Sequence, residues 1–435
     1  HYKVPGFAVA VIEDGKLAWA EGFGEQEAGT GIPVERDTIF AGASISKPVT
    51  AFLALQMVER GLLTLDGNVN DVLTSWKLPE NEFTRGNPVT LRWLLTHRAG
   101  TTVHGFGGSK EKITLIETLE GRPPAKNGPV RVDKAPGGTV RYSGGGTTIV
   151  QQMLEDATGE DFASLAKRYI FDPLGLERTT FAYPPPADLL ALMSRGHNED
   201  GSVVDGGYSF CPQQAAGGIH TSAPDFAKFM IACRDAWLGK PGALLRRDLA
   251  LEMMDPGPYG QGLGWRIIGR EPHRRMEHGG SCQGYQCETT MYLDGGDGVV
   301  VLTNGVGGLS FYWEVINTVA DLHRWEDYLP PPKRVVKLSP AEMERYVGDY
   351  KIVAGVDAPK LSVWIEDGRL MNQIEGMRGG PRVMRLADTG RTFNSSGPYE
   401  TVIEYADDGK AETLTVLEGG TAEILKAVRI RKTAA

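Results

Sequence analysis

A change in sequence pattern near residue 330 constrains the fold of this chain more than any other feature. Before it, apolar runs at helical spacing are mixed with hairpin-like segments. After it, short alternating runs separated by Asp-Gly, Thr-Gly and Gly-Gly turns continue to the end of the chain. The boundary segment, YLPPPKRVVKLSP, has the prolines and basic residues of a linker. The sequence therefore predicts a mixed domain over residues 1–330 and an all-β domain over residues 336–435.

Composition limits the function classes open to this chain. Its 435 residues are 41% hydrophobic, which is enough apolar surface for a large core. The formal net charge of −9 argues against binding to nucleic acid or to an anionic membrane surface. The absence of an apolar run of about 18 residues predicts that no segment spans a membrane. The expected partner is a small-molecule or peptide substrate, and assembly into a homo-oligomer is left open.

The cysteines and the first residues bear on the compartment. Four cysteines are too few for a disulfide scaffold, and an extended segment would hold Cys282 and Cys287 too far apart to form a bridge. The chain starts at His1 without an initiator Met or a recognisable targeting segment, so we expect a trimmed N-terminus. The compartment is therefore unknown, with a periplasmic or secreted location favoured over a cytoplasmic one.

Three local patterns predict specific elements of the mixed domain. An apolar strand over residues 7–12, a turn over 13–16 and a second strand over 17–22 predict a hairpin. Apolar residues from position 49 to 58 predict a helix that is buried on much of its surface. Ser222 and Asp225 predict a capping box at the start of a later helix.

The tetrapeptide Ser44-Ile45-Ser46-Lys47 stands at the start of that buried helix. One helical turn brings the Ser44 and Lys47 side chains to the same face, and the helix N-terminus offers a backbone N–H to a developing oxyanion. A partly desolvated lysine can be neutral enough to act as a base for a serine. The alternative is a capping serine beside a surface lysine, and a tetrapeptide of this kind is common by chance.

Two further short motifs, which follow the tetrapeptide in the sequence, favour the catalytic interpretation over the capping one. Tyr142 lies in a glycine-rich loop that opens a helix, and His278-Gly279-Gly280 lies at the edge of a strand before Ser281. The set resembles the serine β-lactamase and penicillin-binding-protein superfamily, in the branch of class C β-lactamases, DD-carboxypeptidases, D-aminopeptidases and related esterases. The resemblance covers about residues 1–330. It implies an α+β fold, an antiparallel sheet flanked by helices with an all-helical subdomain.

The resemblance also implies a role for each matched residue. Ser44 matches the acylating nucleophile, Lys47 the lysine that activates it, and Tyr142 the tyrosine that relays protons. The backbone N–H groups of Ser44 and Ser281 match the oxyanion hole. The matched substrate-binding positions lie in two of these motifs. They are His278, Gly279 and Gly280 in the histidine motif and Gly144, the third residue of the motif that begins at Tyr142.

This sequence departs from the family pattern at two of those positions. Gly144 stands where relatives carry an Asn, so an amide that would bind substrate and lysine is missing. His278 stands where many carry a Lys, which predicts a weaker and pH-dependent cation. Both changes argue against efficient β-lactamase action. The expected activity is that of a serine peptidase or amidase on peptides, including those with D-residues. The alternatives are a carboxylesterase on short-chain esters, a β-lactamase, and a non-catalytic binding module.

No cofactor is expected, and the histidines give a metal site little support. The eight histidines have no H-E-x-x-H or C-x-x-C partners. We interpret His97 and His104 as residues whose side chains form hydrogen bonds near a loop, in preference to binding a metal. The tail from residue 336 resembles the lipocalin-like β-barrel domains appended to some D-aminopeptidases. The alternating runs themselves predict a small barrel or sandwich of about eight strands. The resemblance implies a barrel that either shapes substrate access or acts as a passive module.

Overall fold

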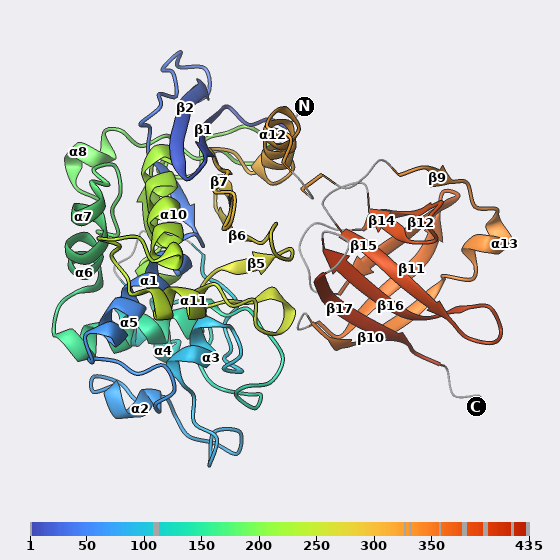
Figure 1. Cartoon of the computed structure of the whole chain (residues 1–435), viewed down its shortest axis with the longest axis horizontal. Helices are drawn as coiled ribbons and strands as arrows, with labels where there is room; N and C mark the ends of the chain where they lie inside the picture. The colour runs from blue at the N-terminus through green and yellow to red at the C-terminus, as the bar shows by residue number, and fades with distance from the viewer. Residues whose placement is uncertain are drawn as a thin grey trace. The chain divides into compact units, whose positions relative to one another are not determined.

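The structure is a computed structural model, and it describes residues 2–107, 113–325, 328–329, 333–355, 358–375, 381–394, 399–418 and 422–431. Two compact units are present, residues 1–257 with 261–323, and residues 258–260 with 324–435 (Figure 1). The prolines at 330–332 in the expected linker lie outside the described residues. The exact domain boundaries at 330 and 336 stay predictions. Among the described helices, none is long and apolar enough to cross a membrane.

A six-stranded antiparallel sheet organises the first unit. The predicted hairpin is confirmed, because the first two strands pair along their whole length. The segment 275–303 forms a three-stranded antiparallel meander. In spatial order the strands are β2 (Lys16–Gly24), β1 (Gly6–Glu13), β8 (Gly298–Thr303), β7 (Tyr285–Tyr292), β6 (Arg275–Cys282) and β5 (Arg266–Ile268).

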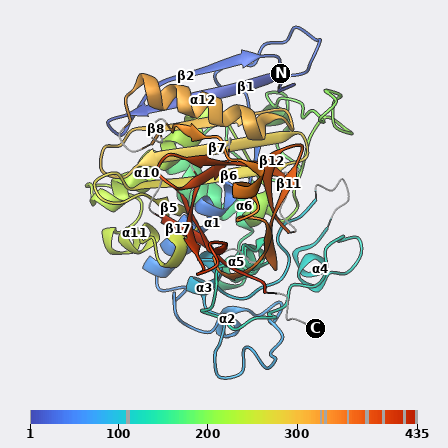
Figure 2. The same cartoon turned by 90° about the vertical axis from the view of Figure 1, so that its right-hand side faces the viewer.

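Helices cover the sheet as the α+β prediction requires. Helix α10 (Ala223–Leu238) packs on β1, β2 and β8, and α12 (Gly308–Leu322) lies across β7 and β8 (Figure 2). Along β1 the alternate residues Ala8, Ala10 and Ile12 enter the main hydrophobic core, as the two-residue period of a strand requires.

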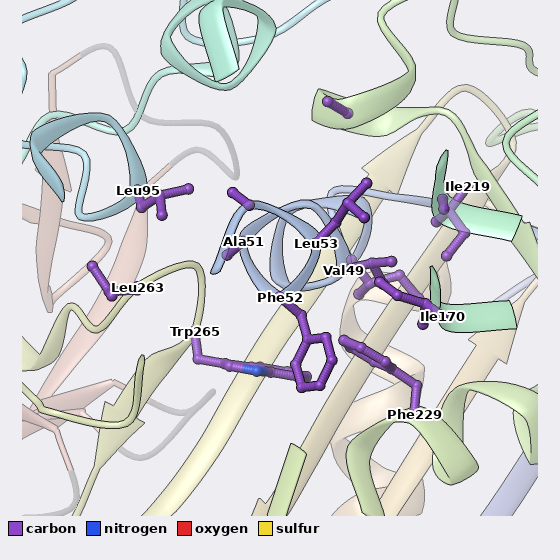
Figure 3. Close-up of a cluster of buried hydrophobic side chains, with 14 of the residues drawn as sticks. Val49, Ala51, Phe52, Leu53, Leu95, Ile170, Ile219, Phe229, Leu263 and Trp265 are labelled. Carbon is purple, nitrogen blue, oxygen red and sulfur yellow. The ribbon is translucent and has the colours of Figure 1, made fainter. Parts of the chain in front are cut away.

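The buried helix α1 (Ser46–Glu59) is the centre of this core. It contains the predicted segment 49–58 and is apolar around most of its circumference, which is typical of a helix enclosed by other elements. Phe52 packs edge-on against Phe229 of α10 at 5.7 Å, and Phe229 stacks on Trp265 at 6.3 Å between ring centroids (Figure 3). This packing holds the start of α1 at a fixed place beside the sheet.

The helical subdomain is inserted between the two short strands β3 (Phe40–Ala43) and β4 (Ile219–Thr221), which pair with each other. Helix α11 (Arg247–Met253) and the short turn η2 (Pro258–Gly260) follow α10. Between β3 and β4 the chain forms α1, α2 (Val69–Val72), α3 (Leu91–Leu95), α4 (Leu115–Glu120), α5 (Gly144–Thr158), α6 (Phe162–Ala166), the π-helical turn η1 (Lys167–Phe171), α7 (Asp172–Leu174), α8 (Ala187–Leu190) and α9 (Gln214–Gly217).

The capping box predicted at Ser222 is only half correct. The Ser222 side chain accepts a hydrogen bond from the backbone N–H of Asp225 at 3.4 Å. The Asp225 carboxylate instead accepts from the backbone N–H of Arg178 at 2.7 Å and from the Thr179 hydroxyl at 3.1 Å. A buried carboxylate binds the donors that tertiary structure supplies, which a local motif cannot indicate.

The second unit contains a closed barrel of eight antiparallel strands, in agreement with the prediction of about eight. The ring closes through the pairing of β12 with β13. Its core includes Tyr350, Leu361, Leu414 and Leu425. The ring is β10 (Gly348–Ala354), β11 (Lys360–Glu366), β12 (Arg369–Ile374), β13 (Arg382–Ala387), β14 (Thr392–Asn394), β15 (Tyr399–Tyr405), β16 (Ala411–Glu418) and β17 (Ala422–Arg429), with α13 (Pro340–Met343) preceding it and β9 (Val335–Val336) added beside β13.

Candidate active site

Ser44 occupies a tight turn between β3 and α1. The residue before it, Ala43, has a φ of 47°, in the left-handed region that residues other than glycine rarely adopt. Ser46 holds this turn, since its hydroxyl donates to the Ala43 carbonyl at 2.6 Å and accepts from the Ile219 N–H at 3.0 Å. The strained turn places Ser44 directly before the first turn of α1, where backbone N–H groups lack partners within the helix.

Lys47 lies one helical turn further and contacts Ser44 directly. Its Nζ donates to Ser44 Oγ at 3.1 Å and to the Ala216 carbonyl of α9 at 2.6 Å. The Lys47 side chain is buried, and within the described residues no carboxylate pairs with it. The arrangement places an amine within hydrogen-bond distance of the Ser44 hydroxyl, as a base that activates a serine requires.

Tyr142 completes the group of residues that the sequence had assigned to catalysis. It precedes Ser143, the N-cap of α5, and the centroid of its ring lies 4.8 Å from Lys47 Nζ. Three imidazoles surround the same ring, with centroid distances of 4.4 Å to His97, 5.0 Å to His104 and 6.3 Å to His278. The structure therefore brings Tyr142 and His278, which are distant in the sequence, to the Ser44–Lys47 pair.

His278 differs from the pH-dependent cation that the sequence suggested. Burial, together with the nearby charge of Lys47, lowers the pKa of His278 to about 3. Its Nδ1 lies 2.7 Å from the Gly279 carbonyl, which can only accept, so Nδ1 carries the proton of the neutral ring. A neutral His278 at pH 7 differs from the weaker, pH-dependent cation that the sequence predicts, and its contact with substrate stays a prediction.

His97 is a buried neutral imidazole of the same site. Its Nδ1 accepts a hydrogen bond from the Ser143 N–H at 3.3 Å. This agrees with the interpretation that His97 forms a hydrogen bond to loop backbone. Burial, together with the nearby charge of Lys47, holds the pKa of His97 well below its usual range. No local sequence pattern indicates that His97 and His104 flank Tyr142, because that proximity depends on how the loops fold.

The strand β6 passes very close to the Ser44 turn. A Cβ on Gly280 would lie 2.1 Å from the Gly42 carbonyl and 2.6 Å from Cys287 Sγ, so only glycine fits there. A Cβ on Gly279 would lie 2.6 Å from a carboxylate oxygen of Glu288. Ser281 follows on the strand and is exposed. This placement is compatible with an oxyanion hole formed by the N–H groups of Ser44 and Ser281, which stays a prediction.

Gly144 is buried at the start of α5. Its N–H donates to the His104 carbonyl at 2.9 Å, so that donor is already used within the protein. A contact between Gly144 and substrate therefore remains a prediction. Elsewhere, all four cysteines are free thiols. No group of three or more His, Cys, Asp or Glu side chains in the described ranges could hold a metal ion.

Comparisons with known proteins identify the family and several relatives of this chain. A family model described as beta-lactamase matches residues 1–353. Penicillin-binding protein 4 from Amycolatopsis lactamdurans is 26% identical over 365 residues, covering 78% of this chain and 92% of that protein. A D-aminopeptidase from Gluconobacter oxydans is 27% identical over 317 residues, covering 69% of this chain and 56% of that enzyme. A lovastatin esterase from Penicillium rubens is 28% identical, covering 56% of this chain and 68% of that enzyme.

The chain spans only part of some of these relatives. It covers 42% of an unguisins hydrolase from Aspergillus violaceofuscus, to which it is 27% identical over 255 residues. Among solved structures, an octameric penicillin-binding protein homologue from Pyrococcus abyssi superposes with a TM-score of 0.64 at 20% identity, covering 98% of this chain and 96% of that one. At this identity the likeness shows a shared fold.

Proposed function

Because the chain belongs to the beta-lactamase family, whose model matches residues 1–353, we propose that it is a serine hydrolase that forms an acyl-enzyme on Ser44. The observation that carries the proposal is the 3.1 Å hydrogen bond between Lys47 Nζ and Ser44 Oγ. A serine hydroxyl is a weak nucleophile, and an adjacent base is the usual means of activating it. Lys47 is the group in contact with Ser44 that can serve as this base.

Acylation follows from the arrangement around Ser44. Lys47 takes the hydroxyl proton while Ser44 Oγ attacks the substrate carbonyl carbon. The backbone N–H groups of Ser44 and Ser281 hold the resulting oxyanion, a contribution that is typically worth several kcal/mol, about 3–4 per donor. Collapse of the tetrahedral intermediate breaks the bond to the leaving group, to which Tyr142 delivers a proton.

Deacylation uses the same residues in the reverse direction. A water molecule gives a proton to Tyr142 or Lys47 and attacks the acyl carbon, and Ser44 leaves with a proton returned to it. Lys47 Nζ lies 4.8 Å from the centroid of the Tyr142 ring, so the two residues that we propose exchange protons belong to one site.

The substrate class we propose is peptides or amides, including those that contain D-residues. The D-aminopeptidase and penicillin-binding protein relatives support this class. A carboxylesterase is the second candidate, favoured by the lovastatin esterase among the relatives. A neutral His278 cannot supply the positive charge for a carboxylate, which disfavours efficient β-lactamase action. A non-catalytic binding module needs no proton-transfer unit, so the Ser44–Lys47–Tyr142 group disfavours that function.

A substrate panel tests the proposal. Wild type and Ser44→Ala would be compared on L-peptides, D-aminoacyl amides, short-chain p-nitrophenyl esters and nitrocefin. Ser310→Ala, an exposed serine on α12, is the matched control. We expect Ser44→Ala to lose turnover of every substrate that wild type accepts and Ser310→Ala to keep it. Undiminished turnover by Ser44→Ala would overturn the proposal.

A further inference from the structure

We propose that His104 is a substrate-binding residue of this site, supplying the hydrogen bond that an amide side chain at position 144 would otherwise make. The inference rests on the proposed function, because it assigns a role within the same hydrolytic site. Its basis is the segment 102–106, which packs against Tyr142 and the start of α5.

Three hydrogen bonds tie this segment to α5. The Ser143 hydroxyl donates to the Thr102 carbonyl at 2.7 Å. The N–H groups of Gly144 and Gly145 donate to the carbonyls of His104 at 2.9 Å and Val103 at 3.0 Å. Three successive carbonyls are therefore fixed to the first turn of the helix that follows Tyr142. The position of His104 relative to Tyr142 is set by the backbone and does not depend on side-chain packing alone.

The backbone next to His104 is strained. Val103 has a φ of 65°, in the left-handed region, which is an outlier for a β-branched residue. Such strain persists where surrounding contacts enforce it, commonly at functional sites. Here the strained residue directs the chain so that the His104 ring lies 5.0 Å from the Tyr142 ring.

The same segment fills the space that a side chain at position 144 would need. A Cβ on Gly144 would lie 3.1 Å from the Phe106 ring, 3.2 Å from the His104 carbonyl and 3.4 Å from Gly105 Cα. A side chain at position 144 would therefore be tightly packed against this segment, which would have to shift by a few tenths of an ångström. The absence of Asn at position 144 is thus coupled to the presence of the 102–106 segment beside Tyr142.

His104 differs from the other two imidazoles around Tyr142 in its exposure. His97 and His278 are buried, whereas His104 is exposed. A neutral imidazole offers one donor and one acceptor, which are the functions that an Asn amide also offers. We therefore assign to His104 a hydrogen bond to an amide on the acyl side of the substrate, as a peptide presents it.

Two activated esters with the same leaving group test this assignment. The p-nitrophenyl ester of N-acetylalanine, in both D and L forms, carries an acyl-side amide, and p-nitrophenyl propionate lacks it. The variants are His104→Ala, His104→Asn and, as a remote control, His323→Ala at the end of α12. Because a lost hydrogen bond is worth about 1–1.5 kcal/mol, His104→Ala should lower kcat/KM for the preferred N-acetylalanine ester about tenfold more than for the propionate.

The remaining outcomes separate this inference from the proposed function. Recovery of the preference in His104→Asn, with His323→Ala unchanged, would support a role in binding. Equal effects of His104→Ala on both esters, including no effect on either, would overturn the inference while Ser44→Ala inactivity still supports the proposed function. Turnover of both esters by Ser44→Ala would overturn the proposed function itself.

Discussion

At the scale of single residues, Lys47 decides how this site works. Its Nζ has two hydrogen-bond acceptors, Ser44 Oγ and the Ala216 carbonyl, and a ring face at 4.8 Å. The hydrogen bond to the Ala216 carbonyl fixes the position of the Lys47 amine. The Ser44 hydroxyl is the group that we propose this amine deprotonates. The Lys47 side chain is buried and its amine contacts Ser44, which is the geometry that a base for this serine requires.

Removal of the amine tests this role. Lys47→Met keeps an unbranched side chain of similar size and takes away only the base and donor. We expect kcat to fall by about 10²–10⁴, the usual contribution of general-base catalysis, with little loss of stability. Kinetics on the best panel substrate and thermal unfolding would measure both. A variant with at least half of the wild-type kcat would show that Lys47 is not the base.

Position 144 gives a second prediction at this scale. Gly144→Asn supplies the amide that relatives carry, but its Cβ would lie 3.1 Å from the Phe106 ring and 3.2 Å from the His104 carbonyl. We expect this variant to lose activity, because the 102–106 segment must shift. Combining it with Phe106→Ala should restore part of kcat/KM. Higher activity in Gly144→Asn alone would contradict this steric argument.

At the scale of elements, the site depends on the approach of β6 to the turn between β3 and α1. Glycine at position 280 allows the strand to pass against the Gly42 carbonyl. Cys287 on the neighbouring β7 donates its thiol hydrogen to the same carbonyl at 3.3 Å. The two N–H groups assigned to the oxyanion belong to the elements that meet here, so their separation depends on this contact.

An added methyl group should disturb that contact. Gly280→Ala would place Cβ 2.1 Å from the Gly42 carbonyl, whereas Gly295 has nothing within 4 Å of its Cβ position. We expect Gly280→Ala to lower kcat at least about 100-fold, as loss of an oxyanion donor does, and Gly295→Ala to match wild type. Steady-state kinetics with both variants measures this effect. Equal kcat in the two variants would remove β6 from the proposed oxyanion hole.

At the scale of the whole molecule, three buried histidines couple folding to pH. Burial lowers the pKa of His278 to about 3 and of His220 to about 4, and holds that of His97 well below its ordinary value of about 6.5. Above pH 6.5 these groups are neutral in both the folded and unfolded states. As the pH falls towards 4, only the unfolded chain takes up the protons, so stability is lost.

The expected slope can be measured. Each histidine should lower the unfolding free energy by at most about 1.4 kcal/mol per pH unit between about pH 6.5 and pH 4. Denaturant unfolding at several pH values would show the decline. The variant His220→Gln should make the fall of the unfolding free energy with pH less steep, by the contribution of about one bound proton. A stability that stays constant from pH 7 to pH 4.5 would contradict the burial of these histidines.

Local patterns were enough to predict much of the fold. The hairpin of β1 and β2, the buried helix α1 and the eight-stranded barrel follow from periodicity and turn residues. The proximity of Ser44 and Lys47 follows from one helical turn. The strained conformations of Ala43 and Val103, and the burial that neutralises His278, depend on contacts between distant segments. Such contacts leave no local signature, so the sequence could not reveal them.

Trapping the acyl-enzyme tests the central claim most directly. The full-length protein would be treated with an alkyl fluorophosphonate, digested, and analysed by peptide mass spectrometry, with Ser44→Ala and Lys47→Met in parallel. We predict one modified serine, Ser44, with labelling absent in Ser44→Ala and strongly slowed in Lys47→Met. Labelling of a different serine, or no labelling of wild type while a panel substrate is still hydrolysed, would contradict the account.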